Sequence, residues 1–346
     1  MLSFRSFSRD ILFLSALWLY VTTLSTAQRS DSRDLTESTT RIVGGSKTGA
    51  DRYSYQAITG RIRTTRKNIW QCGGTLIAPD VIMTAAHCIP ERTREKKKWG
   101  AQIGRYDLSD NREKIEFRND VIEQTARRIL IFPSYTDPSD PGSNITWTND
   151  LALMFFPRKF TRNSNDHEYV RLNTNSSVPA DSDVLSVVGW GDTDAVGEEV
   201  NDFKLETTVV YDDTCGNFGN DTRYNAASML CGDGGGTNDT CRGDSGGPIL
   251  IKGKTDASDV QVGITSFGSK DCAGEGVPGV YTRISEPAMM KWIMEEVCGR
   301  SRSPPGYFNC ASKCFDKSRF CANVSERKCS RKRFEERCCA SCEQYA

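Results

Sequence analysis

Three short segments limit what this chain can fold into more than any other feature. They are Cys241–Pro248 (Cys-Arg-Gly-Asp-Ser-Gly-Gly-Pro), Thr84–Cys88 (Thr-Ala-Ala-His-Cys) and Asn149–Leu153 (Asn-Asp-Leu-Ala-Leu). They bring in a histidine, an aspartate and a serine, in one of several unrelated chain orders that build the same catalytic geometry. Because a serine hydroxyl needs a neighbouring base before it attacks a carbonyl, the pattern indicates nucleophilic chemistry.

The main part of the chain, residues 42–298, which we call the body, has a pattern that predicts β-structure. From Ile42 onward, short runs of β-prone residues are separated by Gly, Pro, Asn and Asp, which favours an all-β barrel or sandwich. The clearest runs are Gly74–Ala78, Val81–Thr84, Leu151–Phe156, Val184–Trp190, Pro248–Lys252 and Val260–Phe267.

A fourth segment, Arg41–Gly45 (Arg-Ile-Val-Gly-Gly), is a basic residue followed by a small apolar start. In this order, the four segments resemble the trypsin/chymotrypsin-like serine proteases over residues 42–298. The resemblance implies two antiparallel six-stranded β-barrels with the active site in the cleft between them. It also implies a C-terminal helix packed onto the second barrel.

A helical pattern follows Ser285-Glu286-Pro287. Met289, Ile293 and Val297 recur at a spacing of four and predict a buried stripe. Ser285 is the expected N-cap, and Gly299 is expected just after the helix ends.

The resemblance assigns a role to each site residue. Ser245 is the nucleophile, His87 the general base, and Asp150 the acceptor that fixes the imidazole tautomer. The backbone N–H groups of Gly243 and Ser245 form the oxyanion hole. The other histidine, His167, lies in a polar stretch typical of a solvated loop.

Specificity follows from the same comparison. Asp239 stands at the floor of the pocket for the residue before the scissile bond, where a carboxylate selects Arg or Lys. Gly268 and Gly279 match the pocket walls, and Ser266 starts the strand segment that pairs with substrate backbone. Phe267 replaces the family's usual Trp.

Activation is expected to require one cut. Cleavage after Arg41 by a trypsin-like protease would free the amine of Ile42, which by resemblance pairs with Asp244. The chain is therefore predicted to be a zymogen. Residues 28–41 are polar and hold no cysteine, so this propeptide should be released once cut.

The N-terminus predicts secretion. Arg5 and Arg9 precede a largely apolar run, Ile11–Leu24, and a small-residue site, Ser25–Ala27. A membrane anchor is the alternative, but the run is short for a span of about 20 residues. Residues 1–27 are thus expected to be a signal peptide of an extracellular protein.

The chain holds 14 cysteines, which secretion makes disulfide candidates. The family pairing implies three disulfides, Cys72–Cys88, Cys215–Cys231 and Cys241–Cys272. Cys298 is left over and makes an even set with seven cysteines of the tail. A zinc site in the tail is the alternative, but the tail lacks histidine and the expected compartment favours disulfides.

The C-terminal part differs from the body in charge. Residues 42–298 hold 29 Lys and Arg against 36 Asp and Glu, whereas residues 299–346 hold 11 against 5. We expect a linker over 299–309 and a cross-linked basic tail over 310–346. This tail either binds anionic surfaces or is simply a solvated basic surface. Its last cysteines are loosely similar to small toxin-like disulfide modules, from whose spacing they depart.

No cofactor or metal is expected. Arg105 stands where a calcium-binding relative has a ligand carboxylate, and Pro278 where sodium-activated relatives have an aromatic. Expected partners are proteins or peptides with Arg or Lys before the scissile bond, an activating protease and protease inhibitors. Neither nucleic acid nor a membrane span is expected.

Two alternatives remain: a non-catalytic homologue that binds a partner, and a binding protein directed by its tail. The chain also has five Asn-x-Ser/Thr sequons, at Asn144, Asn175, Asn220, Asn238 and Asn323. Because Asn238 adjoins the expected pocket floor, we expect it to carry no glycan.

Overall fold

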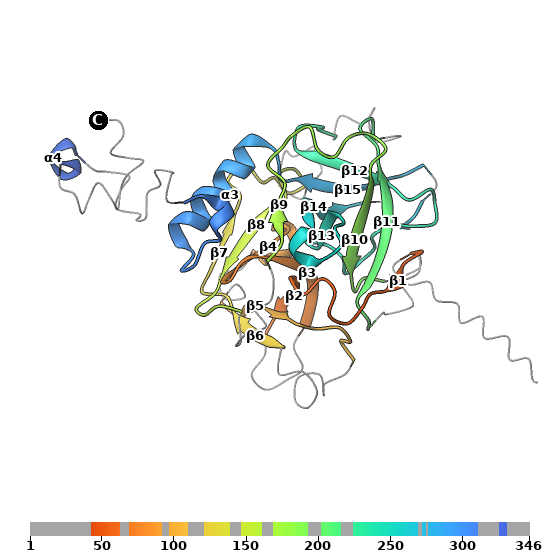
Figure 1. Ribbon diagram of the computed structural model, residues 1–346, viewed down its shortest axis with the longest axis horizontal. Helices are drawn as coiled ribbons and strands as arrows, with labels where there is room; N and C mark the ends of the chain where they lie inside the picture. The colour runs from red at the N-terminus through yellow and green to blue at the C-terminus, as the bar shows by residue number, and fades with distance from the viewer. Residues whose placement is uncertain are drawn as a thin grey trace, which may run out of the picture. The chain divides into compact units, whose positions relative to one another are not determined.

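The protein is described by a computed structural model (Figure 1). The described residues are 43–62, 69–91, 97–109, 121–138, 147–160, 169–192, 202–215, 224–268, 272–274, 276–310 and 325–330. The expected signal peptide, the propeptide, Arg41, Ile42 and most of the tail lie outside them.

The first half of the body forms one antiparallel sheet in the order β6-β5-β2-β3-β4-β8-β7. The end strands β6 and β7 are separated only by Ala126 and Arg127, so one bent segment borders both β5 and β8. The N–H groups of Ala126 and Arg127 donate to the carbonyls of Trp99 and Phe155 and continue this pairing. The strands are β2 (Gln56–Arg61), β3 (Ile69–Ala78), β4 (Val81–Thr84), β5 (Trp99–Ile103), β6 (Ile122–Thr125), β7 (Arg128–Ile131) and β8 (Ala152–Phe155).

The second half closes on itself. Strands β11-β10-β13-β14-β15-β12 follow one another, and β12 pairs again with β11, which makes a six-stranded barrel. Two short strands extend this sheet: β1 (Ser46–Lys47) pairs with β11, and β9 (Arg171–Leu172) runs parallel to β14. The barrel strands are β10 (Val184–Gly189), β11 (Leu205–Tyr211), β12 (Met229–Asp233), β13 (Pro248–Ile251), β14 (Val260–Phe267) and β15 (Gly279–Arg283).

Burial follows the side-chain alternation of half-covered strands. In β11 the buried residues Leu205, Thr207, Val209 and Tyr211 alternate with more exposed ones, which gives the period of two. β4, β8 and β15 are instead buried at every position. Each expected strand run coincides with a strand, although the runs at β8, β10 and β13 were expected one residue too long at one or both ends, and the prediction of two barrels is confirmed.

The C-terminal helix α3 (Pro287–Arg300) differs from the expectation at both ends. Its N-cap is Glu286, whose carboxylate accepts the Met289 N–H at 2.7 Å, whereas Ser285 is buried one residue earlier. The Glu286 side chain thus accepts an open N–H of the first turn, the role that was expected of Ser285. Gly299 does not end the helix, which runs on to Arg300.

The stripe of α3 is buried as predicted, but its partner is different. Met289, Ile293 and Val297 are fully buried in the cluster that holds the first barrel's core, and Trp292 packs edge-on against Phe132 at 5.4 Å. The core of the second barrel contains none of these residues. The expectation that α3 packs onto the second barrel was therefore wrong.

The segment expected as a linker is packed against the body. The Tyr307 hydroxyl lies 3.0 and 3.2 Å from the carbonyl oxygens of Ile77 and Val170, which share its one hydrogen as acceptors. Phe308, in the short helix η5 (Gly306–Phe308), is 2% exposed. A disulfide joins Cys298 to Cys310, the first cysteine of the tail. Beyond it, the structure describes the short helix α4 (Glu326–Cys329).

A buried ion pair ties the chain entering β2 to the β13–β14 connection. The Arg52 guanidinium donates to both Asp256 and Asp259, and its Nη2 lies 2.7 Å from an Asp259 oxygen. The Asp259 side chain is fully buried and also accepts the Tyr55 hydroxyl.

Within the described part of the chain, no helix is long and apolar enough to cross a bilayer.

We expect Arg52→Met to lower the free energy of unfolding by about 3 kcal/mol, because it leaves a buried carboxylate without its partner. Lys252→Met is the control, since Lys252 pairs with Glu206 at 2.7 Å but is 47% exposed. Its cost should stay below about 1 kcal/mol. Urea unfolding with the disulfides intact measures both, and equal costs would contradict this account.

Candidate active site

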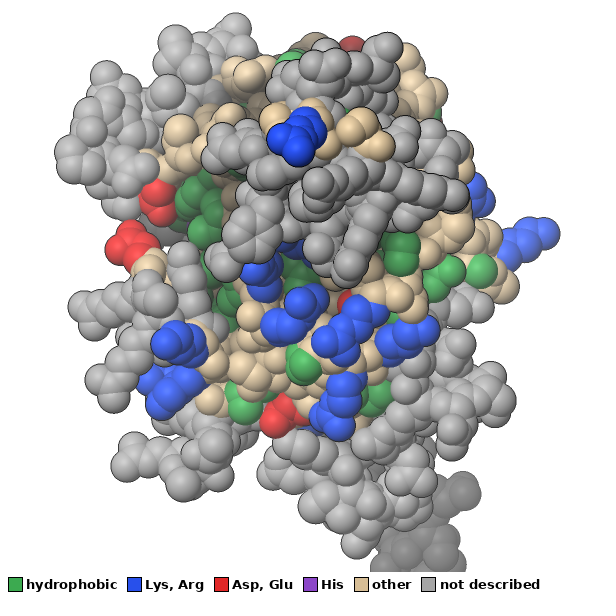
Figure 2. Space-filling model, turned by 90° about the vertical axis from the view of Figure 1, so that its left-hand side faces the viewer, with side chains coloured by type: hydrophobic (Ala, Val, Ile, Leu, Met, Phe, Trp, Pro, Cys, Tyr) green, Lys and Arg blue, Asp and Glu red, His purple; other side chains and the backbone are tan. Residues whose placement is uncertain are grey.

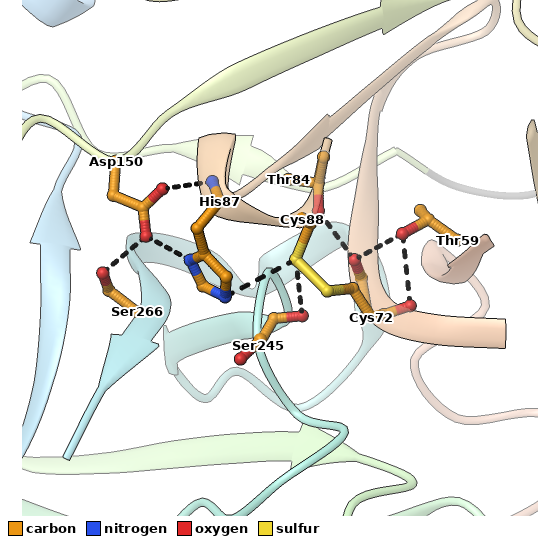
Figure 3. Close-up of a disulfide and its surroundings, with 9 residues drawn as sticks. Thr59, Cys72, Thr84, His87, Cys88, Asp150, Ser245 and Ser266 are labelled. Carbon is orange, nitrogen blue, oxygen red and sulfur yellow. Dashed lines mark hydrogen bonds and ion pairs between the residues drawn. A yellow bond between two sulfur atoms is a disulfide. The ribbon is translucent and has the colours of Figure 1, made fainter. Parts of the chain in front are cut away.

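His87 is held between two strands of the first barrel. It lies in the short helix η1 (Ala86–Cys88), directly after β4, and the Cys72–Cys88 disulfide ties this turn to β3. The imidazole lies between Asp150 and Ser245 (Figure 3). Its side chain is 14% exposed, so one edge remains accessible.

Asp150 is fully buried and carries several hydrogen bonds. Its carboxylate accepts the His87 backbone N–H at 2.9 Å and faces His87 Nδ1 at 2.6 Å (Figure 3). The Ser266 hydroxyl donates to the same Asp150 oxygen that faces Nδ1, also at 2.6 Å. Such a buried acceptor fixes the imidazole with its proton on Nδ1 and leaves Nε2 free to take a proton.

Ser245 sits in a tight turn between two glycines. Gly243 and Gly246 have φ angles of +98° and +81°, in the left-handed region that favours glycine. The Ser245 carbonyl accepts the Gly73 N–H at 2.8 Å, which fixes the turn against β3 of the first barrel. A Cβ on Gly243 would lie 3.0 Å from the Gly191 Cα, so a side chain there would crowd the backbone beside the expected oxyanion hole.

The described contacts include no hydrogen bond between the Ser245 hydroxyl and His87. Hydrogen bonds of this kind are often long in ligand-free sites and tighten only in the complex with substrate. The structure thus brings His87, Asp150 and Ser245 together and directly joins the first two.

Asp244 is buried beside the nucleophile and is 1% exposed. Its carboxylate accepts the backbone N–H groups of Gly191 and Cys241, at 2.8 and 3.0 Å. Burial raises the pKa of Asp244 to about 7, and these two hydrogen bonds offset only part of the effect. Among the described residues, no basic side chain pairs with it.

Asp239 and the two glycines expected at the pocket walls lie together. A Cβ on Gly279 would be 2.8 Å from Asp239 Oδ1, and a Cβ on Gly268 would be 3.6 Å from the Gly279 Cα. Asp239 is 3% exposed and accepts the N–H groups of Thr240 and Ala273 at 2.7 and 2.8 Å. Burial raises its pKa to about 6 against these hydrogen bonds.

Two functional contacts were missed by the sequence analysis. Ser266, expected only in the substrate-pairing strand, supports Asp150 through its side chain. Trp147 stacks on the His87 imidazole with ring centroids 4.6 Å apart and meets Phe267 edge-on at 6.1 Å. In the sequence, only its aromatic side chain and its position three residues before Asp150 could have pointed to Trp147.

The three expected body disulfides, Cys72–Cys88, Cys215–Cys231 and Cys241–Cys272, are confirmed. The last one links the segment before Ser245 to Cys272, beside Ala273, whose N–H donates to Asp239. Asn238 is half-buried, and its amide nitrogen donates to the Thr208 carbonyl at 3.2 Å. This contact supports the expectation that Asn238 carries no glycan, which stays a prediction.

The position expected to disfavour calcium holds a buried guanidinium. Arg105 is 5% exposed and donates to the Asp107 carbonyl at 2.7 Å. A cation at this position would repel calcium, so the expectation keeps its physical basis. It stays a prediction, as does the one drawn from Pro278.

Comparison with known proteins gives the family. The family model for trypsin matches residues 42–293. The chain is 30% identical over 267 residues to CLIP domain-containing serine protease B4 of Anopheles gambiae, covering 75% of this chain and 71% of that one. It is 29% identical over 271 residues to CLIP domain-containing serine protease HP8 of Bombyx mori, covering 74% and 69%.

A third relative is chymotrypsin-like elastase family member 1 of Homo sapiens, 29% identical over 273 residues, covering 76% of this chain and 94% of that one. The chain therefore belongs to the trypsin family of serine proteases. Because its relatives include a chymotrypsin-like elastase, family membership does not fix which bonds it cleaves, and this depends on the pocket.

Proposed function

We propose that the protein is a secreted serine endopeptidase, made as a zymogen, that cleaves peptide bonds after Arg and Lys. The observation that carries the proposal is the buried Asp150–His87 pair beside Ser245 (Figure 3). The buried Asp239, expected at the pocket floor, lies six residues before Ser245 and supports the specificity. A non-catalytic homologue would have no need to keep all of these groups. We therefore favour the enzyme over the two alternatives.

The chemistry follows from the positions of the groups. Ser245 Oγ attacks the scissile carbonyl while His87 Nε2 takes its proton, and the carbonyl oxygen becomes an oxyanion. The N–H groups of Gly243 and Ser245 receive that charge. His87 then gives the proton to the leaving amine, which departs and leaves an acyl-enzyme, and water repeats the sequence to release the acid. Asp150 stabilises the imidazolium throughout.

Ser245→Ala should lower the turnover of activated enzyme by several orders of magnitude, because it removes the nucleophile and leaves only binding and oxyanion stabilisation. Ser176→Ala, at an exposed position of the second half, is the control and should leave turnover unchanged. Steady-state kinetics with an Arg peptide, together with active-site titration, measure both. Near-normal turnover of Ser245→Ala would rule out the triad.

Specificity should depend on the charge of Asp239. Because its pKa is raised to about 6, the carboxylate takes up a proton as the pH falls through that value and loses its attraction for a basic side chain. We expect KM for an Arg substrate to rise below about pH 6. The ratio of kcat/KM values for Arg and apolar substrates isolates this effect, because His87 serves both.

Asp239→Ser is the matching variant. It should lower that ratio by at least about a hundredfold and remove its dependence on pH. A ratio that stays constant from pH 5 to pH 8 in the unmodified enzyme would contradict the assignment of Asp239 as the pocket floor.

Zymogen activation is supported by the surroundings of Asp244. The carboxylate is buried with two N–H donors and no cation among the described residues, so a positive charge would be stabilised there. The chain just after the expected cut lies close to the pocket floor. The Val43 carbonyl accepts the Asp239 N–H at 3.2 Å, and Gly44 packs against Asn238. A freed amine on Ile42 would supply the missing charge.

Arg41→Gln should block activation by a trypsin-like protease without unfolding the chain. Arg33→Gln is the matched control, since it removes an arginine from the same propeptide and should activate normally. Mass spectrometry of the new N-terminus and peptide hydrolysis are the measurements. Full activity of uncut material would contradict the pairing of the Ile42 amine with Asp244.

The wider setting follows from the same proposal. Substrates are proteins or peptides with Arg or Lys before the cut, the activator is itself trypsin-like, and protease inhibitors are natural partners. The basic tail over 310–346 is proposed as a separate module for anionic surfaces, and it lies almost entirely outside the described residues.

A further inference from the structure

One face of the protease body gathers exposed cations (Figure 2). Three chain segments contribute to it: the turn between β6 and β7, the turn after β8, and the chain just after α3. We call this group the basic patch, and its exposed members are Arg127, Arg128, Arg158, Lys159 and Arg302. The body as a whole is acidic, so their grouping is not a consequence of composition.

The backbone holds these three segments side by side. The side chain of Gln124, 5% exposed, exchanges hydrogen bonds with the Arg158 backbone: its Nε2 donates to the carbonyl at 3.1 Å and its Oε1 accepts the N–H at 3.2 Å. Arg127 donates to the Arg300 carbonyl at 3.5 Å, and Arg302 donates to the Pro157 carbonyl. The buried side chain of Gln124 and two hydrogen bonds from the patch arginines to backbone carbonyls therefore hold the three segments together.

Acidic groups near the patch are already engaged. Asp80 is fully buried, and its carboxylate accepts the Ser301 hydroxyl and the Arg302 N–H at 2.5 and 2.9 Å. Glu296 pairs with Arg300 on the last turn of α3. Within the described part of the chain, no carboxylate forms an ion pair with any of the five patch residues.

We propose that the basic patch is a binding site for a sulfated polysaccharide. Four of its five cations are guanidinium groups, whose planar fork of N–H donors matches the oxygens of sulfate and carboxylate. Like charges held together without counter-ions repel one another, and a linear polyanion relieves this repulsion at several points at once.

The surroundings distinguish this ligand from other polyanions. The large exposed apolar residues of the described chain are Ile69, Val184 and Val210, and none lies on a patch segment. The patch therefore offers no large exposed apolar side chain for insertion into a lipid surface and no exposed aromatic platform for stacking of bases. Its main feature is positive charge, on a protein expected outside the cell.

The proposal does not depend on proteolysis, so it can be tested on the full-length chain carrying Ser245→Ala, which cannot digest itself. The test variant is Arg158→Gln/Lys159→Gln, because both side chains are exposed and only their backbone groups hold the turn. The control is Lys252→Gln/Lys254→Gln, which removes the same charge from another exposed turn. A third variant, Arg331→Gln/Lys332→Gln/Arg333→Gln, measures how much the tail contributes to the affinity for the polyanion.

Titration with a size-defined heparin oligosaccharide at physiological ionic strength gives Kd. We expect the Arg158/Lys159 variant to bind about tenfold more weakly and the Lys252/Lys254 control to bind like the parent. Desulfated heparin should bind the parent weakly and should not distinguish the variants. The difference between test and control should shrink as salt is raised.

Three results would overturn the proposal. Equal binding by the Arg158/Lys159 variant and the parent would leave the tail as the only anion site. Equal losses in the test and control pairs would show a response to net charge. Duplex DNA or phosphatidylserine vesicles that bind as tightly, with the same dependence on Arg158 and Lys159, would assign the patch to a different partner.

Discussion

The structure depends most on one buried carboxylate, that of Asp150. Its hydrogen-bond partners come from both halves of the body: His87 from the first barrel, and Ser266 on β14 of the second. The Asp150 backbone carbonyl accepts a fourth hydrogen bond, from the Thr282 hydroxyl on β15. A charge without solvent needs all of its donors, so a shift of one barrel against the other would cost several kcal/mol at this residue. The same bonds that satisfy the charge therefore fix the imidazole and set how the two barrels meet.

The chain before β2 adds a second constraint across the molecule. From Val43 to Tyr55 it touches the second half at several points, among them Asp239, the β1–β11 pairing and the Arg52 ion pair. Only then does it enter the first barrel. The residues that would follow the activating cut are thus anchored beside Asp239 and Asn238, so the activation proposed above requires a movement of only the first residues.

The sequence predicts the fold and most of the site because the relevant positions sit in short, characteristic segments. His87, Asp150, Ser245 and Asp239 lie in or beside such motifs, and the three body disulfides follow from the pairing that the family resemblance implies. Contacts between distant segments left no comparable signal. Ser266 reaches Asp150, and Trp147 stacks on His87, through the tertiary fold alone. The Pro- and Gly-containing stretch after α3 has the composition of a linker, yet two adjacent aromatics pack on the body, where Phe308 is buried and Tyr307 half-buried. Composition indicates the conformation that a segment prefers by itself, whereas the positions of these aromatic side chains depend on the surface of the body that they contact.

The disulfide between Cys298 and Cys310 has a topological consequence for the C-terminus. It closes a covalent ring, with the two cysteines 12 positions apart, and Arg300 and Arg302 lie inside this ring. Hydrolysis of a peptide bond inside a ring opens it without separating its ends. A nick after either arginine would therefore yield a two-chain molecule whose C-terminal fragment stays attached until the disulfide is reduced. Each nicked protease body would therefore still carry one tail, so a surface that binds the tail would also hold the protease.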